Sequence, residues 1–164
     1  MSKKFQITGT CIPEKHYMVH MKSQIQKIVS EYIEEGQYFS INRARQYGKT
    51  TTLYLLERYL KKEYLVISLS FEAADELFYS LYIFASGLIR NIGKDLKMQN
   101  VSEELLQNWL KPISPEFPFH DLSDRITDLC SNSPRKIILM IDEVDKSSEN
   151  QIFLSFLGLL REKY

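Results

Sequence analysis

A run of five apolar residues followed directly by two acids constrains this chain more than any other feature. Residues Ile137–Ile141 read Ile-Ile-Leu-Met-Ile, and Asp142 and Glu143 come next. A short, continuous apolar run is typical of a strand that is buried on both faces of a parallel sheet. Because ligands of open α/β sheets bind at the carboxyl ends of the strands, we expect the two acids to lie at a binding edge.

The rest of the chain alternates between helical and strand patterns. Strands are predicted at Tyr38–Ile41 and Tyr64–Phe71, which are rich in β-branched and aromatic residues. Helical spacing of apolar residues predicts helices over 22–35 (ended by Gly36), 49–62, 74–96, after 102, over 120–130 and, behind a capping box at Ser148-x-x-Gln151, to the end of the chain. This alternation predicts an α/β fold with a mostly parallel sheet.

Length and composition predict one soluble domain. The 164 residues suit a single domain spanning 1–164, and the prolines between 111 and 119 mark an excursion within it. Apolar residues make up 44%, and 21 basic residues balance 21 acidic ones, which excludes a disordered chain and a wholly basic surface. The longest apolar run is too short to span a membrane, and the two cysteines lie far apart. We therefore expect a cytoplasmic protein that has neither a membrane segment nor a disulfide scaffold.

Gly48, Lys49 and Thr50 stand between a predicted strand and a predicted helix. A glycine there lets backbone N–H groups turn toward phosphate oxygens, and the start of the helix adds a partial positive charge. A lysine in this place reaches the β- and γ-phosphates, and a threonine hydroxyl is a magnesium ligand. Arg43 occupies the position of the first glycine in the usual G-x-x-x-x-G-K-[ST] pattern.

The two acids complete the chemistry that a phosphate loop needs. One carboxylate can hold the shell of a magnesium ion, and the next can orient and activate a water molecule. The alternative is that the acids cap the final helix, a role for which Asp145 and Ser148 are better placed. Arg43 and Arg45 have two possible roles: they contact phosphate, or they form ion pairs with these acids. Phosphate contact is favoured for Arg45.

At these residues the sequence resembles the prokaryotic AAA-ATPase-like domain proteins, a branch of the P-loop ATPases. The resemblance covers nearly the whole chain and rests on residues 11–19, 39–53 and 138–146. The loop of that family often reads R-x-R-x-[FY]-G-K-[ST], so Arg43 in place of a glycine matches the family pattern.

The resemblance implies ATP and Mg²⁺ as cofactors and gives each motif residue a role. It implies that Thr50 and Asp142 hold the magnesium ion, that Glu143 is the general base, and that the segment around Pro13 and Tyr17 lies near the adenine. The nucleotide contacts that it implies, around the Walker A lysine, are Arg45, Gln46, Tyr47, Gly48, Lys49, Thr50 and Thr51; Asp142 and Glu143 correspond to the Walker B acids.

The resemblance also implies a P-loop NTPase three-layer sandwich that is truncated after the helix following the Asp-Glu strand. Relatives place one further central strand, a polar sensor and an arginine finger beyond that helix, and this chain stops at Tyr164. ATP binding is therefore expected of this chain, and magnesium-dependent hydrolysis is expected of the complete protein. Whether this chain is itself an enzyme is left open.

Other function classes are weighed against this one. The first alternative is a nucleotide-binding interaction module without turnover, and the second is an accessory module of a DNA-processing protein. Nucleic acid as a partner rests on family analogy alone. Self-association or a partner protein is expected from the missing central strand, because an uncovered sheet edge recruits other chains. A cluster of aromatic residues, Phe71, Phe78, Tyr79, Tyr82 and Phe84, is predicted to pack in the core because its spacing is helical.

Overall fold

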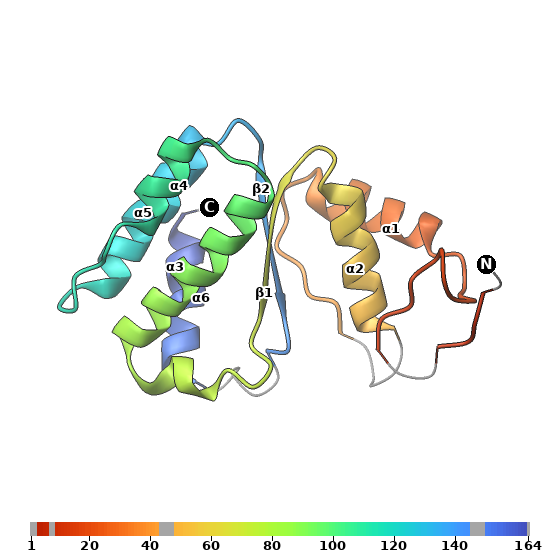
Figure 1. Ribbon diagram of the computed structural model, residues 1–164, viewed down its shortest axis with the longest axis horizontal. Helices are drawn as coiled ribbons and strands as arrows, with labels where there is room; N and C mark the ends of the chain where they lie inside the picture. The colour runs from red at the N-terminus through yellow and green to blue at the C-terminus, as the bar shows by residue number, and fades with distance from the viewer. Residues whose placement is uncertain (1–2, 7–8, 43–47, 145–149, 164) are drawn as a thin grey trace. The chain divides into compact units, whose positions relative to one another are not determined.

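The computed structural model of the chain describes residues 3–6, 9–42, 48–144 and 150–163 (Figure 1). The chain divides into two compact units, Met1–Lys62 and Glu63–Tyr164, and each unit is described by itself. None of the helices in these described ranges is both long enough and apolar enough to cross a membrane.

Two helices form most of the regular structure of the first unit. Helix α1 spans Lys22–Ile28 and continues as a π-helical turn, η1, over Val29–Ile33. Gly36 follows with a φ of 64°, a left-handed conformation that suits the glycine after a helix. Helix α2 spans Lys49–Leu60 and contacts α1. The apolar side chains that the two helices bury are Ile25, Val29, Leu56 and Leu60.

The segment before α1 is irregular apart from one short pairing. Lys4 and His16 form an isolated parallel bridge. The N–H of Lys4 donates to the carbonyl of Lys15 at 3.0 Å, and the N–H of Tyr17 donates to the carbonyl of Lys4 at 3.0 Å. These bonds hold the first described residues beside residues 15–17.

The predicted strand at Tyr38–Ile41 is wrong. The structure assigns no strand to this segment, and Tyr38 is 64% exposed. A strand exists only through ladder hydrogen bonds to a neighbour, and the sheet found among the described residues is built from other segments. The residue types favoured a β conformation, but they could not supply a pairing partner.

The second unit contains a two-stranded parallel sheet. Strand β1 spans Leu65–Ser70 and strand β2 spans Ile137–Asp142. They pair from Leu65 opposite Ile137 through to Ser70 opposite Asp142. Both strands lie within two residues of the predicted ones, and the α/β class with parallel pairing is as predicted.

Helices cover one face of this sheet, as Figure 1 shows for α3, α4, α5 and α6. The helical elements of the second unit are the 3-10 helix η2 at Asp75–Tyr79, α3 at Leu81–Met98, α4 at Glu103–Leu110, α5 at Pro118–Asn132 and α6 at Gln151–Glu162. Alternate residues of β1, namely Leu65, Ile67 and Leu69, pack against these helices. Their register partners on β2, namely Ile137, Leu139 and Ile141, pack on the same core.

Aromatic rings fill the centre of this core. Phe84 is fully buried, and its ring lies 5.9 Å from Phe71, 5.3 Å from Phe78 and 5.6 Å from Phe156, measured between centroids. The predicted core role is therefore confirmed for Phe71, Phe78 and Phe84. It is wrong for Tyr79 and Tyr82, which are exposed because the expected helix over 74–96 is interrupted.

Helix starts differ from prediction at two places. The N–H of Ile83 donates to the hydroxyl of Ser80, which is extended and caps α3, so that η2 and α3 are separate elements. Helix α6 begins at Gln151, and its cap is Asn150, whose side-chain oxygen accepts from the N–H of Ile152 at 2.9 Å. The expected cap, Ser148, lies outside the described residues. Asn is as good an N-cap as Ser, and it stands directly before the helix.

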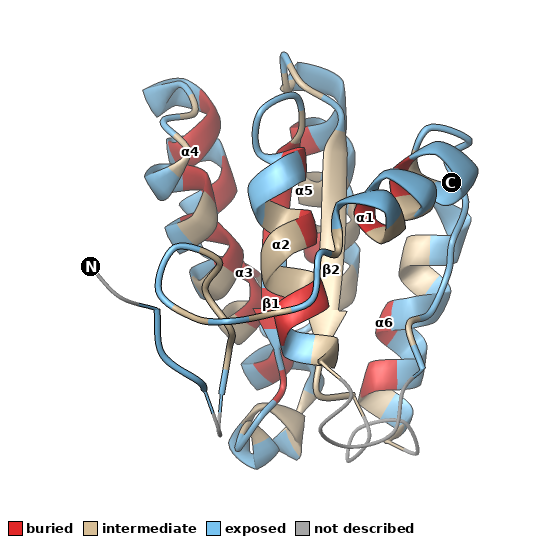
Figure 2. Ribbon diagram, turned by 90° about the vertical axis from the view of Figure 1, so that its right-hand side faces the viewer, coloured by how far each residue is buried: buried red, intermediate tan, exposed pale blue. Residues whose placement is uncertain are grey.

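Strand β2 is less buried than predicted. Figure 2 shows β1 mostly buried (red) and β2 intermediate (tan). The prediction of burial on both faces is wrong: the helices of the second unit pack on one face of the sheet, and every residue of β2 stays partly exposed.

The other edge of β1 is covered by side chains instead of a strand. The side-chain amide of Gln99 accepts from the N–H of Val66 at 3.1 Å and donates to its carbonyl at 2.6 Å. The carboxylate of Asp95 accepts from the N–H of Ser68 at 2.8 Å. Both side chains come from the C-terminal end of α3, so this helix both packs on the sheet and satisfies its outer edge.

Candidate functional site

The start of α2 has part of what the phosphate-loop prediction requires, a left-handed glycine directly before a helix, but residues 38–41 do not form the strand predicted ahead of it. Gly48 is the N-cap, with a φ of 75°, and a Cβ built there would meet no atom within 4 Å. The backbone conformation, and not a lack of space, therefore favours glycine at this position. Gly48 has no side chain that could accept from the N–H groups of the first turn, where Lys49 and Thr50 lie.

The first turn of α2 is tied to the segment near the N-terminus. Thr51 is buried, and its hydroxyl oxygen accepts from the N–H of Cys11 at 3.1 Å. The hydroxyl of Thr52, also buried, donates to the carbonyl of Gly48 at 2.9 Å. Thr50 is exposed at the same turn. Of these three adjacent threonines, Thr50 is thus the exposed one.

Part of the predicted loop lies outside the described residues. Arg45, Gln46 and Tyr47, which were predicted to contact nucleotide, belong to this part, as does Arg43.

The two acids stand at the carboxyl end of β2, as predicted from the apolar run. Asp142 is the last residue of the strand and lies opposite Ser70 of β1. Its carboxylate accepts from the N–H of Glu143 at 2.9 Å, and its carbonyl accepts from the N–H of Phe71 at 3.2 Å. These bonds fix the position of the Asp142 carboxylate at the edge of the sheet.

Glu143 adopts a backbone conformation that its residue type disfavours. Its φ is 55°, in the left-handed region, and the residue is half-buried. For a residue with a Cβ this conformation costs about 1–2 kcal/mol. Such outliers are concentrated at functional sites, where the surrounding structure enforces them. The strain therefore marks Glu143 as a candidate functional residue independently of its charge.

The structure places the predicted site residues in two groups. Gly48, Lys49, Thr50 and Thr51 lie together in the first unit, at the start of α2. Asp142 and Glu143 lie together in the second unit, at the end of β2.

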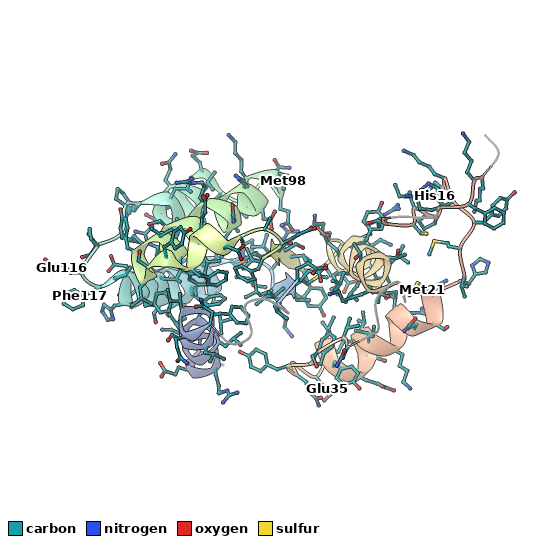
Figure 3. All side chains as sticks on the ribbon, turned by 90° about the horizontal axis from the view of Figure 1, so that it is seen from below. His16, Met21, Glu35, Met98, Glu116 and Phe117 are labelled. Atoms are coloured by element: carbon teal, nitrogen blue, oxygen red, sulfur yellow. The ribbon has the colours of Figure 1, made fainter. Side chains whose placement is uncertain are left out.

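The first unit also holds an apolar cavity of about 470 Å³. Two of its lining residues, Pro13 and Tyr17, belong to the segment that the resemblance places near an adenine. Figure 3 labels Met21, which belongs to the stretch from Tyr17 to Lys22 that forms most of the wall, and His16, which stands directly before that stretch. The other lining residues are Lys3, Met18, Val19, His20, Met21, Lys22, Ile25, Leu55 and Tyr59.

An ion pair lies beside this cavity wall. The guanidinium of Arg58, on α2, donates to the carboxylate of Glu14 at 2.9 Å. A backbone hydrogen bond and the Arg58 guanidinium together lower the pKa of Glu14, and the same pair raises the pKa of Arg58. The pair joins the residue after Pro13 to the helix that carries Lys49.

Sequence reasoning missed the part of the cavity that α2 supplies. Leu55 and Tyr59 are four residues apart and therefore share one face of the helix, but helical spacing alone could not show that this face borders a cavity.

His16 and His20 are four residues apart, a spacing that resembles that of zinc ligands, but the two side chains have different surroundings. His16 accepts from the N–H of Ile12 through Nδ1 at 2.9 Å, and His20 lines the cavity.

One family model matches the chain. It describes an AAA-like domain, and it covers residues 8–164, which include the start of α2 and the end of β2. No curated protein and no solved structure matches the chain.

Proposed function

The chain belongs to the AAA-like domain family, and on this premise we propose that it binds ATP together with Mg²⁺. Family membership supports nucleotide binding in general, and the start of α2 is the observation that carries the specific proposal. There the left-handed Gly48 is followed by Lys49 and by the N–H groups of a first helical turn. Backbone donors, a partial positive charge and an ammonium group are what a triphosphate needs.

The nucleotide contacts are assigned along the loop and the first turn of α2. Lys49 binds the β- and γ-phosphates, and Gly48 and Thr51 contribute backbone N–H groups, since the Thr51 hydroxyl already accepts from Cys11. Arg45, Gln46 and Tyr47 are assigned to the same loop, following the R-x-R-x-[FY]-G-K-[ST] pattern. Their assignment rests on sequence alone.

Thr50 and Asp142 are assigned to the magnesium ion. A hydroxyl and a carboxylate are hard oxygen donors of the kind that Mg²⁺ prefers, and Thr50 is the threonine of this turn that is exposed. When bound, the ion neutralises charge that develops on the phosphates during their transfer. We further propose that residues 1–164 constitute one AAA-like domain.

Glu143 is assigned as the general base of ATP hydrolysis. A carboxylate can accept a proton from water as the water attacks phosphorus. The strained backbone of Glu143 supports this role, because backbone outliers of this kind cluster at functional sites. The carboxylate of its neighbour Asp142 accepts from the N–H of Glu143.

The cavity of the first unit is assigned to the nucleotide base. A mostly apolar cavity of about 470 Å³ is large enough for a purine and its ribose. The bond from Cys11 to Thr51 ties this segment to the turn that carries Lys49. Pro13 and Tyr17 provide flat surfaces against which a ring can pack.

A titration of the full chain with fluorescent ATP, with and without Mg²⁺, tests the proposal. Lys49→Ala removes the ammonium from a charge-assisted contact, so the affinity for ATP should fall about 30-fold, the equivalent of about 2 kcal/mol. Lys27→Ala is the matched control, because Lys27 is an exposed lysine of α1 that pairs with Glu31. Unchanged affinity in Lys49→Ala would show that the phosphate assignment is wrong.

A phosphate-release assay on the same protein separates an enzyme from a binding module. Release that stops in Glu143→Gln supports hydrolysis, whereas tight binding of ATP without any release leaves the nucleotide-binding interaction module as the function.

A further inference from the structure

The charges of the chain are divided unevenly between its two units. Residues 1–62 contain 11 of the 21 Lys and Arg residues but only 5 of the 21 Asp and Glu residues. Their formal net charge is therefore +6, and residues 63–164 carry −6. The zero net charge of the whole chain conceals this segregation, and a basic half of this kind is typical of proteins that bind polyanions.

The carboxylates of the first unit do not neutralise its surplus. The ion pairs that the structure describes in this unit join Lys27 to Glu31, Arg58 to Glu14 and Lys61 to Glu57. Five exposed lysines form no ion pair with any described residue: Lys3, Lys4, Lys15, Lys22 and Lys62. Lys3 acts electrostatically on Glu14, which pairs with Arg58, and the charge of the other four lysines is available to a ligand.

Several of these lysines are brought together with exposed aromatic rings. The backbone bonds between Lys4 and residues 15–17 place Lys4 beside Lys15. Phe5 and Tyr17 follow on the same two segments, with ring centroids 5.0 Å apart. Phe5 is 82% exposed and Tyr17 is 54% exposed. We call Lys3, Lys4, Phe5, Lys15 and Tyr17 the N-terminal basic surface.

The basic character continues around the adjoining cavity. Lys3 and Lys22 line it together with Tyr17 and Tyr59, and none of its lining residues is acidic. The ammonium of Lys62 lies 5.9 Å from the centre of the Tyr59 ring. Lysines and aromatic rings thus occur together at the cavity wall and at the end of α2.

We propose that the N-terminal basic surface binds single-stranded nucleic acid. Single strands expose both a chain of phosphates and the faces of their bases, and proteins bind them with cationic grooves and aromatic side chains. The solvent-exposed rings of Phe5 and Tyr17 can stack on bases, while Lys3, Lys4 and Lys15 contact phosphates. A duplex hides its base faces, so it could use the lysines only.

This surface shares Lys3 and Tyr17 with the cavity assigned to the nucleotide base, but none of its residues is assigned to phosphate binding or catalysis. Lys4, Phe5 and Lys15 do not line the cavity assigned to the nucleotide base. The inference therefore does not rest on the proposed function, and substitutions at these three residues should leave the affinity for ATP unchanged.

Fluorescence anisotropy of a labelled oligo(dT) of about 15 nucleotides, titrated with the full chain, tests the inference. Contacts from three to five lysines predict that a rise from about 50 to about 200 mM salt weakens binding roughly 20- to 100-fold. The double variant Lys4→Glu, Lys15→Glu should bind at least about tenfold more weakly and should reduce the salt slope by about 1.4. Phe5→Ala should lose about tenfold through the loss of stacking.

The control is the double variant Lys94→Glu, Lys136→Glu, which makes the same change of net charge on exposed lysines of the second unit. Equal loss in this control would show that net charge alone drives binding and would overturn the inference. So would binding of a duplex as tight as that of oligo(dT). Co-sedimentation with phosphatidylserine vesicles in the absence of oligonucleotide binding would identify a membrane surface as the partner instead. Loss of oligonucleotide binding in Lys49→Ala would place the strand at the phosphate loop and would likewise overturn it.

Discussion

The left-handed backbone of Glu143 predicts that replacing this residue with glycine gives a more stable protein than replacing it with alanine. Glu143→Ala and Glu143→Gly remove the same carboxylate and every contact that it makes. Alanine retains a Cβ at a φ of 55°, a conformation that costs about 1–2 kcal/mol, whereas glycine adopts it without strain. Glycine also gives the unfolded chain more freedom, which offsets about 0.5–1 kcal/mol. The glycine variant should therefore be the more stable of the two by about 0.5–1 kcal/mol.

Thermal unfolding followed by circular dichroism measures this difference. For a chain of this length, 1 kcal/mol corresponds to about 2–4 °C in Tm, so Glu143→Gly should melt about 1–4 °C above Glu143→Ala. Glu116 supplies the matched control, because it is an exposed loop residue without a positive φ. There the order should reverse, with the glycine variant the less stable. If glycine is not the more stable at 143, the backbone of Glu143 is not strained and the argument from strain to function fails.

Three further predictions concern the acids, the sheet edge and the cavity wall. Glu143→Gln should retain binding of ATP and Mg²⁺ and lose turnover, whereas Asp142→Asn should lose the magnesium-dependent part of the affinity; identical behaviour in calorimetric titrations would contradict the separate roles. Gln99→Leu leaves the N–H and carbonyl of the buried Val66 without their side-chain partner, which should cost about 2 kcal/mol of stability and lower the Tm by about 4–8 °C. Gln107→Leu, at an exposed position of α4, should not lower the Tm in this way. Because the folded-state pKa of Glu14 is lowered, the contribution of Glu14 to stability is complete above its unfolded value near 4.5 and is lost as the pH falls through the folded pKa. Glu14→Gln should therefore flatten the fall of Tm at acid pH, and an unchanged profile would show that the pair with Arg58 contributes nothing.

Local pattern was sufficient to predict most elements of the second unit. The apolar run before Asp142 and the β-branched run at residues 64–71 each predicted a strand to within two residues, because such runs need little context. The segment Tyr38–Ile41 has similar residue types but forms no strand. Pairing is decided by distant residues, and propensity cannot report it.

The candidate site was predictable where its chemistry depends on residue type alone. Gly48, Lys49 and the two acids follow from what phosphates and magnesium require. The cavity residue Tyr59 could not be found in this way, because only the packing of the first unit shows which face of α2 borders open space. The left-handed backbone of Glu143 also could not be predicted from the sequence, since such positions usually hold glycine or asparagine.

The side chains of Gln99 and Asp95, which cover the outer edge of β1, also limit how copies of this sheet can associate. Fibrillar assembly by strand addition needs two open edges on every sheet, one to join the copy before and one to receive the copy after. Gln99 and Asp95 occupy the backbone groups of Val66 and Ser68 on one edge, so within the described part of the chain only the β2 edge of this sheet remains for pairing. Two copies that pair through β2 each present a sealed β1 outward. Edge-to-edge growth of this sheet therefore terminates at a closed pair and cannot run on into a fibre.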